Sequence, residues 1–306
     1  MLQRIQVEFL VADKQRFGLS CALVTPFGED GAVDLPRLAR HARSVVERGC
    51  DTVTLYGTTG EGAAIGIRDR ERMAGAVIAG GVPAGRLYAG VASAVLDDAI
   101  EQGRIALGLG MRGLLAAPPF YFKGVDDEGL YRWFSAFIEG LGASAREIVL
   151  YHIPSMTAVG LSVDLVGRLK TAFPGVVTAV KDSASNWEGT QAFLAAHPDL
   201  QILVGDERLL AKGVRAGVSG SINGLSNIAP EILRPVIDEG RDSETVIRLV
   251  TAIVKHPVMA ATKALAGHVH GDPGFGPMRA PLRALTAGER AELVAAYEAI
   301  MAEARG

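Results

Sequence analysis

The stretch "GVVTAVKDS", residues 175–183, places a lysine at the end of a run of small and β-branched residues. Such a run is typical of a strand that is covered on both faces. Lys181 follows this run directly. Because a lysine is almost never fully buried without a partner, its position at the end of a buried strand requires an explanation.

Seven other short apolar runs accompany the run at 176–181, and longer amphipathic segments such as 34–49 separate them. Apolar residues in these longer segments recur at three- and four-residue steps, which is typical of helices packed on a core. Eight strand–helix units in one chain predict a (β/α)8 barrel. The other predicted strands are 19–24, 51–56, 86–91, 112–117, 147–152, 201–205 and 218–223.

A doubly wound open sheet is the competing fold for alternating strands and helices. That fold usually carries a glycine-rich dinucleotide fingerprint after the first strand. The segment "LVTPFGEDGAVD", residues 23–34, has no such fingerprint, so the barrel is favoured. The same absence argues against a cofactor-dependent oxidoreductase.

The predicted organisation is an N-terminal arm at 1–17, a barrel at 18–240 and a C-terminal helical extension at 241–306. Helical patterns in the extension cover 243–269 and 287–304. We expect Pro257 to kink or end the first of these helices, because proline removes a helical hydrogen bond.

Composition excludes several classes of protein. The 306 residues are 49% hydrophobic and 21% charged with a net charge of −3, so no basic field indicates a nucleic-acid partner. No apolar run reaches the roughly 18 residues of a membrane span, and charges interrupt the N-terminal segment where a signal peptide would be apolar. The two cysteines, Cys21 and Cys50, form no disulfide framework, and a cytoplasmic location is expected.

Lys181 is predicted to lie where barrel enzymes carry out their chemistry, at the C-terminal end of a strand. Apolar surroundings disfavour the charged amine and are expected to lower its pKa from about 10.4. A neutral amine attacks a carbonyl group to form a Schiff base. A static ion pair is the alternative, but the adjacent Asp182 points to the opposite face of a strand. Position alone leaves both interpretations open.

Two further segments carry candidate functional groups. The loop "YGTTGEG", residues 56–62, has glycines for tight turns, and Thr58 and Thr59 offer hydroxyl and N–H groups to a small carboxylate. Tyr151, at the end of the fifth predicted strand, would be placed to move protons beside Lys181. Each feature alone also fits a purely structural role, as a βα turn or a core tyrosine.

Taken in order, six motifs resemble the dihydrodipicolinate synthase / N-acetylneuraminate lyase family. The resemblance extends from about residue 18 to the end of the chain. It implies a (β/α)8 barrel and a class I aldolase mechanism that uses or releases pyruvate. The motifs are "GTTGE" (57–61), "PPFY" (118–121), "YHIP" (151–154), "VKDS" (180–183), "GDE" (205–207) and "GSINGLSN" (220–227).

The resemblance also assigns roles to residues. Lys181 is implied as the Schiff-base lysine and Tyr151 as the general acid/base. Thr58 and Thr59 are implied to bind the keto-acid carboxylate, with the Thr59 hydroxyl relaying protons to Tyr151.

Further implications of the resemblance concern the pocket and the assembly. Tyr121 matches a tyrosine that completes the proton relay across a tight dimer interface, and Gly205 and Ile222 match pocket-lining positions. The family is usually a homotetramer built as a dimer of dimers. No metal or organic cofactor is implied, because the lysine itself is the electrophilic catalyst.

Three departures from the synthases concern the second substrate. Met156 stands where the synthases carry an arginine that binds the carboxylate of aspartate semialdehyde, and a thioether cannot replace that clamp. His152 replaces an asparagine, and Asp182 stands where glutamate is common. Met156, with the apolar Val159 and Leu161 nearby, favours a less anionic aldehyde, either sugar-derived or apolar.

Alternative functions remain open from the sequence. The chain could be a true 4-hydroxy-tetrahydrodipicolinate synthase, or an aldolase or dehydratase of 2-keto-3-deoxy sugar acids, since the same lysine and tyrosine serve all of these reactions. A non-catalytic keto-acid-binding protein is the remaining alternative. It is disfavoured because a pure binder needs neither a desolvated amine nor a proton relay.

Overall fold

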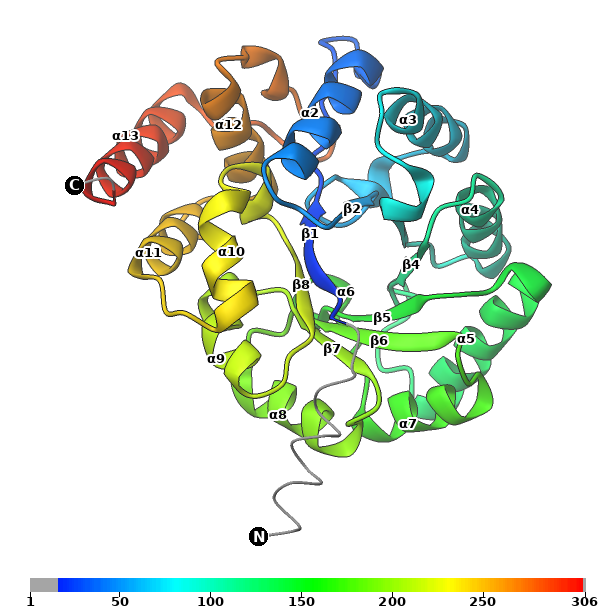
Figure 1. Cartoon of the computed structure of the whole chain (residues 1–306). Helices are drawn as coiled ribbons and strands as arrows, with labels where there is room; N and C mark the ends of the chain where they lie inside the picture. The colour runs from blue at the N-terminus through cyan, green and yellow to red at the C-terminus, as the bar shows by residue number, and fades with distance from the viewer. Residues whose placement is uncertain (1–15, 305–306) are drawn as a thin grey trace, which may run out of the picture.

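The structure, a computed structural model, describes residues 16–304, in which eight parallel strands close into a barrel (Figure 1). Each strand pairs with the next, and β8 pairs with β1 to complete the ring. The predicted (β/α)8 barrel is confirmed. Its strands are β1 (Gly18–Ala22), β2 (Thr52–Leu55), β3 (Leu87–Val91), β4 (Gly113–Ala116), β5 (Ile148–His152), β6 (Val177–Asp182), β7 (Gln201–Val204) and β8 (Gly220–Asn223).

Helices surround the strands, as Figure 1 shows. The first of them lies in the amphipathic segment 34–49, and the Asp34 carboxylate caps its start by accepting a hydrogen bond from the Arg37 N–H at 2.9 Å. The outer helices are α2 (Leu35–Glu47), α3 (Ile67–Ala79), α4 (Leu96–Gly108), α5 (Asp127–Leu141), α7 (Val163–Ala172), α8 (Trp187–Ala196), α9 (Leu210–Arg215) and α10 (Pro230–Glu239), and the single-turn α6 is Pro154–Thr157.

Alternation along β6 directs neighbouring side chains to opposite sides of the barrel wall. Ala179 packs in the cluster that fills the barrel, and Lys181, two residues later, faces the same interior. Val180 belongs to the outer core between strands and helices. Asp182 also points outward, where its carboxylate accepts a hydrogen bond from the Thr190 hydroxyl of α8 at 2.6 Å. Asp182 is therefore not the ion partner of Lys181, as the alternation predicted.

Three helices follow the barrel: α11 (Glu244–Ile253), α12 (Val258–His270) and α13 (Ala287–Glu303). The expected break at Pro257 is confirmed, since α11 ends before it and Pro257 caps the start of α12. Within residues 16–304, no single helix is long and apolar enough to cross a membrane. The pair α11–α12 reaches that length and composition together but bends by 118° between its halves.

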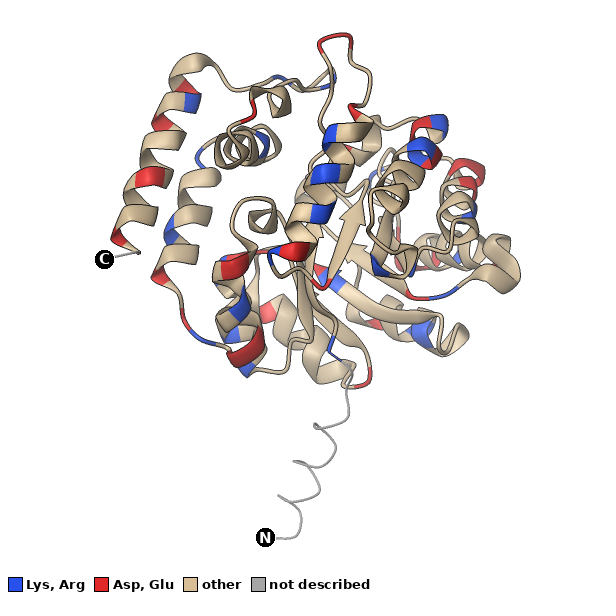
Figure 2. Cartoon of the chain, turned by 45° about the horizontal axis from the view of Figure 1, so that its top comes forward, with Lys and Arg blue, Asp and Glu red and all other residues tan. Residues whose placement is uncertain are grey.

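The remaining expectations concern the chain start, the charges and the cysteines. Residues 1–15 of the predicted arm lie outside the described residues, while Phe17 packs against Tyr88 with ring centroids 5.1 Å apart. Charged residues of both signs are interspersed over the helices and loops in Figure 2. Cys21 and Cys50 are free and buried, and burial together with a hydrogen bond to Cys50 raises the pKa of the Cys21 thiol.

Candidate active site

Lys181 and Tyr151 meet inside the C-terminal end of the barrel. They are paired across β5 and β6, and the lysine Nζ donates a hydrogen bond to the tyrosine hydroxyl at 3.1 Å. The amine also lies 4.3 Å from the centre of the tyrosine ring. Both residues are buried, at 5% exposure each, yet both line a cavity of about 260 Å³. A buried amine beside a hydroxyl and an open cavity is the arrangement that nucleophilic attack on a carbonyl requires.

The loop that follows β2 presents unpaired backbone donors to this cavity. Thr58 and Thr59 both line it, and neither backbone N–H donates to another group in the described part of the chain. The loop folds back closely on itself, and only glycine fits at position 62. A Cβ there would lie 1.7 Å from the carbonyl oxygen of Tyr56. Two free N–H groups and two hydroxyls form a concave site that suits a carboxylate.

The contact with Tyr151 belongs to Thr58 and not to Thr59, which corrects the expectation from the sequence. The Thr58 hydroxyl lies 3.3 Å from the Tyr151 hydroxyl. Thr59 instead faces β8, where a Cβ added to Gly224 would lie 3.7 Å from its hydroxyl oxygen. Adjacent residues of this turn point to different walls of the cavity, so only the first threonine reaches the tyrosine.

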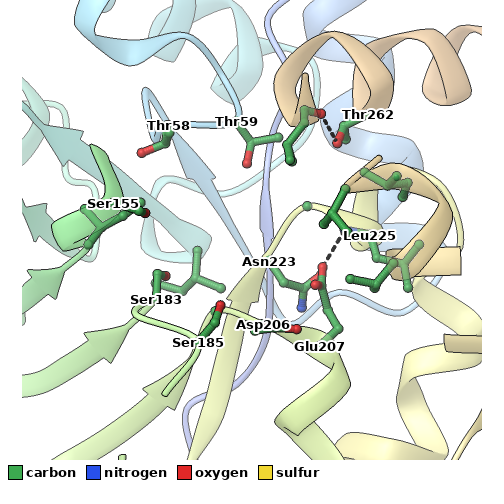
Figure 3. A pocket seen from close by; sticks show the side chains of 18 of the residues that line it. Thr58, Thr59, Ser155, Ser183, Ser185, Asp206, Glu207, Asn223, Leu225 and Thr262 are labelled. Atoms are coloured by element: carbon green, nitrogen blue, oxygen red, sulfur yellow. Dashed lines mark hydrogen bonds between the residues drawn. The ribbon is translucent and has the colours of Figure 1, made fainter. Parts of the chain in front are cut away.

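Polar side chains from the ends of β6, β7 and β8 form one wall of the cavity, and Figure 3 shows them below the Thr58–Thr59 loop. Gly205 lies in this wall, as expected, and a Cβ there would lie 2.0 Å from the Ser183 hydroxyl oxygen. Ile222, the other residue expected to line the pocket, also lines this cavity and is fully buried. The polar members of the wall are Ser183, Ser185, Asp206, Glu207, Arg208 and Asn223.

Asp206 and Arg208 form an ion pair in this wall. The Arg208 guanidinium donates two hydrogen bonds to the two oxygens of the Asp206 carboxylate, at 2.9 and 2.7 Å. Burial of Asp206 favours its neutral form, but the hydrogen bonds from Arg208 and Ser185 outweigh burial and hold the pKa of the carboxyl below its usual value. Asp206 is therefore an ionised acceptor at neutral pH.

Glu207 is a buried carboxyl at the end of the motif "GDE", residues 205–207, and no role was predicted for it. Burial raises its pKa, although its Oε1 accepts a hydrogen bond from the Leu225 N–H at 2.9 Å. Asn223 lies beside it, with its amide donating to Ser221 at 3.0 Å and its oxygen accepting from the hydroxyl of Ser226 at 2.8 Å. Their positions at the ends of β7 and β8 were the available signal in the sequence.

The opposite wall of the cavity is apolar and comes from the C-terminal helices. Met156, predicted as a substrate-binding residue, lies at the rim and is 54% exposed. Val159 and Leu161, which the sequence analysis placed near it, are buried in the outer core and do not line the cavity, because the chain turns away after α6. The apolar wall contains Val250, Ile253, Val254, Val258 and Met259.

Tyr121 lies away from Lys181 of its own chain. Its ring is 74% exposed and contacts Phe122 edge to face, with centroids 5.4 Å apart. Phe122 is 67% exposed. A second cavity of about 420 Å³, largely apolar, adjoins the first and shares Thr58, Tyr151 and Met156 with it. Phe120, which precedes these two exposed rings, lines the second cavity.

His152 has a structural position. Its Nδ1 accepts a hydrogen bond from the Leu161 N–H at 2.9 Å, and it does not line either cavity. Burial lowers its pKa, opposed by Asp182. Within the described residues, no group of three or more histidine, cysteine or acidic side chains is arranged to hold a metal ion.

Comparison with known proteins matches residues 15–300 to the model of the dihydrodipicolinate synthetase family. An uncharacterized DapA-like lyase of Chloroflexus aurantiacus is 34% identical over 295 residues, covering 93% of this chain and 97% of the relative. The 4-hydroxy-tetrahydrodipicolinate synthase 1 of Streptomyces coelicolor is 34% identical over 304 residues, covering 95% and 97%. The crystal structure of a dihydrodipicolinate synthase from Agrobacterium tumefaciens is 46% identical with a TM-score of 0.91, covering 93% and 99%.

Proposed function

The chain belongs to the dihydrodipicolinate synthetase family, and we propose that it is a class I aldolase that forms a Schiff base with pyruvate through Lys181. The observation that carries this proposal is the hydrogen bond between Lys181 and Tyr151 at the end of a closed barrel. In (β/α)8 barrels the substrate binds at the C-terminal ends of the strands. Here two neighbouring strands place an amine and a proton-donating hydroxyl at one cavity.

The first half of the proposed reaction forms the imine. The carboxylate of pyruvate binds the N–H and hydroxyl groups of Thr58 and Thr59, which brings its ketone to Lys181. The amine attacks the carbonyl carbon, and the hydroxyl of Tyr151 donates a proton to the oxygen so that water leaves. The protonated imine withdraws electrons, and the Tyr151 phenolate left by the previous step takes a proton from the methyl carbon, which gives an enamine and restores the tyrosine hydroxyl.

The second half forms the carbon–carbon bond. The enamine carbon attacks the carbonyl carbon of an aldehyde, and the resulting alkoxide takes a proton from Tyr151. Water then hydrolyses the imine, which releases the product and restores the amine. The same steps in reverse cleave a hydroxylated keto acid to pyruvate and an aldehyde. The lysine imine is the electron sink, so the proposed cycle calls on no metal or organic cofactor.

The assembly is part of the proposal. We propose that Tyr121 of a second copy completes the proton relay across a tight dimer interface, within a homotetramer built as a dimer of dimers. The exposure of Tyr121 and Phe122 and the open apolar cavity beside Tyr151 support this arrangement. We also propose a cytoplasmic location, which the two free buried thiols support.

The second substrate is proposed to be an aldehyde that carries hydroxyl groups and no carboxylate. Ionised Asp206 and the serine hydroxyls of the polar wall suit substrate hydroxyl groups and would repel a carboxylate. Arg208 lines the same wall, but Asp206 neutralises it with two hydrogen bonds. Met156 supplies no charge at the rim.

The competing candidate is a true 4-hydroxy-tetrahydrodipicolinate synthase, whose aldehyde is aspartate semialdehyde. This candidate is supported by similarity to two proteins that bear the name of the synthase, one from Streptomyces coelicolor and one from Agrobacterium tumefaciens. A 2-keto-3-deoxy sugar acid aldolase fits the proposed second substrate, because joining pyruvate to a hydroxylated aldehyde gives such an acid. A dehydratase of these acids would use the same imine.

The first test is intact-mass measurement after incubation with pyruvate and borohydride. Wild type is expected to gain one reduced pyruvate, and peptide mapping should locate it on Lys181. Lys181→Ala should fold and gain nothing. Well-folded wild type without an adduct would overturn the proposal. A panel of aldehydes that includes aspartate semialdehyde then identifies the second substrate, and a low KM for that compound would favour the synthase.

A further inference from the structure

A second buried lysine, Lys263, lies close to the active site. Its side chain is completely buried on α12, where the Nζ forms an ion pair with Glu61 at 2.7 Å, and Glu61 is completely buried too. The same Nζ donates to the carbonyl of Pro277 at 2.5 Å. Lys263 lines neither cavity, so its amine is not available to a substrate.

Glu61 belongs to the loop that presents Thr58 and Thr59. It has left-handed backbone torsions, with φ of 57°, and its N–H donates to the carbonyl of Thr58 at 3.0 Å. Non-glycine residues adopt this conformation only where the surrounding structure holds them in it. The position of Glu61 is thus coupled directly to the backbone of Thr58, and through it to the adjacent Thr59.

Both oxygens of the Glu61 carboxylate are held by the segment that follows the barrel. Oε1 accepts from Lys263, and Oε2 accepts the backbone N–H of Arg279 at 3.0 Å. The Arg279 side chain also donates to the carbonyl of Ala64, just beyond the loop, at 2.9 Å. The barrel contributes a contact of its own, from the Thr25 hydroxyl to the carbonyl of Gly60 at 2.7 Å.

The same helix reaches the cavity next to the loop. Thr262 precedes Lys263 and lines the cavity, and a Cβ added to Gly224 would lie 3.7 Å from the hydroxyl oxygens of both Thr262 and Thr59. One turn of α12 therefore bonds the loop of Thr58 and Thr59 through Lys263 and Glu61, and places Thr262 in the cavity that this loop also lines.

A buried ion pair adds little net stability, because removing both charges from water costs free energy. Apolar side chains of similar size are often as stabilising. What the pair adds is direction, since a carboxylate with two specific donors has one preferred position. We propose that Lys263 is a positioning residue for the reaction, which acts through Glu61 to hold Thr58 and Thr59 where they bind the keto-acid carboxylate. This inference rests on the proposed function, and it gives helix α12 a part in binding the keto acid.

The test compares two ketones. Pyruvate has the carboxylate that Thr58 and Thr59 would bind, whereas acetone offers the same reacting carbonyl without it. Borohydride trapping is measured against ketone concentration for wild type and for the double variant Glu61→Gln/Lys263→Met, which leaves no unpaired charge buried. Arg48→Met is the matched control, because it breaks an ion pair with Glu231 on the barrel exterior.

We expect the double variant to trap pyruvate about 100-fold less efficiently than wild type, because a shift of the bound keto acid by roughly 1 Å lowers the rate by about that factor. The efficiency of acetone trapping should stay unchanged. Arg48→Met should trap both ketones as wild type does. Equal losses with both ketones, or an unchanged preference for pyruvate, would overturn the inference. If the double variant does not fold, Glu61→Gln alone is measured in the same way. Absence of any pyruvate adduct on wild type would instead count against the proposed function.

Discussion

Lys181 and Tyr151 lie opposite each other on neighbouring strands, and the lysine Nζ is 3.1 Å from the tyrosine hydroxyl. Parallel pairing of β5 with β6 sets this relationship, because residues in register on adjacent strands point to the same side of the barrel wall. The lysine at the end of a buried strand thus has a hydroxyl group as its partner and not an acidic counter-ion.

Tyr151→Phe is expected to lower kcat by about 10²- to 10⁴-fold, the usual contribution of a positioned general acid/base. The imine with pyruvate should form more slowly, because its formation needs a proton on the leaving oxygen. Steady-state kinetics and the rate of borohydride trapping measure both effects. Tyr56→Phe is the matched control, since the Tyr56 hydroxyl bonds to the carbonyl of Arg70 and should matter for stability only. An equal loss in both variants would refute the role of Tyr151.

Thr58→Val and Thr59→Val should differ in their kinetics. The Thr58 hydroxyl reaches Tyr151 at 3.3 Å, so its loss should lower kcat as well as weaken pyruvate binding. Thr59 makes no such contact, and its loss should raise the KM for pyruvate while kcat changes little. Steady-state kinetics with pyruvate as the varied substrate separate the two effects. The reverse pattern would restore the relay through Thr59 that the sequence indicated.

Met156→Arg should convert the rim of the cavity into a carboxylate site. A hydrogen bond to a charged group is worth about 1.5–3 kcal/mol, so kcat/KM for aspartate semialdehyde should rise by about 10-fold or more. Met156→Leu controls for loss of the thioether and should leave this substrate unchanged. The comparison is a kcat/KM measurement with aspartate semialdehyde for the three proteins. High activity of wild type with aspartate semialdehyde would contradict the premise.

Stability should fall between pH 7 and pH 5 because of His41, a buried residue of α2. Burial lowers the pKa of His41 to about 3. The charges of His270 and Arg48 lower it further, and the hydrogen bond that the ring donates to the Asn227 amide oxygen opposes them. Its unfolded pKa is about 6.5, so below that value the unfolded chain takes up a proton that the folded chain does not. The free energy of unfolding should therefore fall by about 2 kcal/mol from this residue over the interval.

Urea unfolding of wild type and His41→Gln at both pH values measures this contribution. The variant should lose about 2 kcal/mol less than wild type between pH 7 and pH 5. An identical loss in both proteins would show that His41 is not the titrating group.

The strand pattern of the sequence predicted the barrel because each strand is covered on both faces and reads as a continuous apolar run. All eight runs became strands within a few residues of their expected bounds. Pro257 likewise marked the end of the helix before it, since the geometry of proline is a local property of the chain. The expectation for Val159 and Leu161 failed because closeness along the chain does not decide which side of a turn a residue faces.

By itself, the sequence determined the barrel, the placement of Lys181 at a strand end, and the family to which the chain belongs. These follow from periodicity and from motifs, which are properties of short stretches. Only the tertiary structure decided that Thr58 and not Thr59 meets Tyr151, and that Lys263 holds Glu61 from a helix about 200 positions further along the chain. Contacts between distant segments depend on how the whole barrel closes and packs, and no local pattern specifies them.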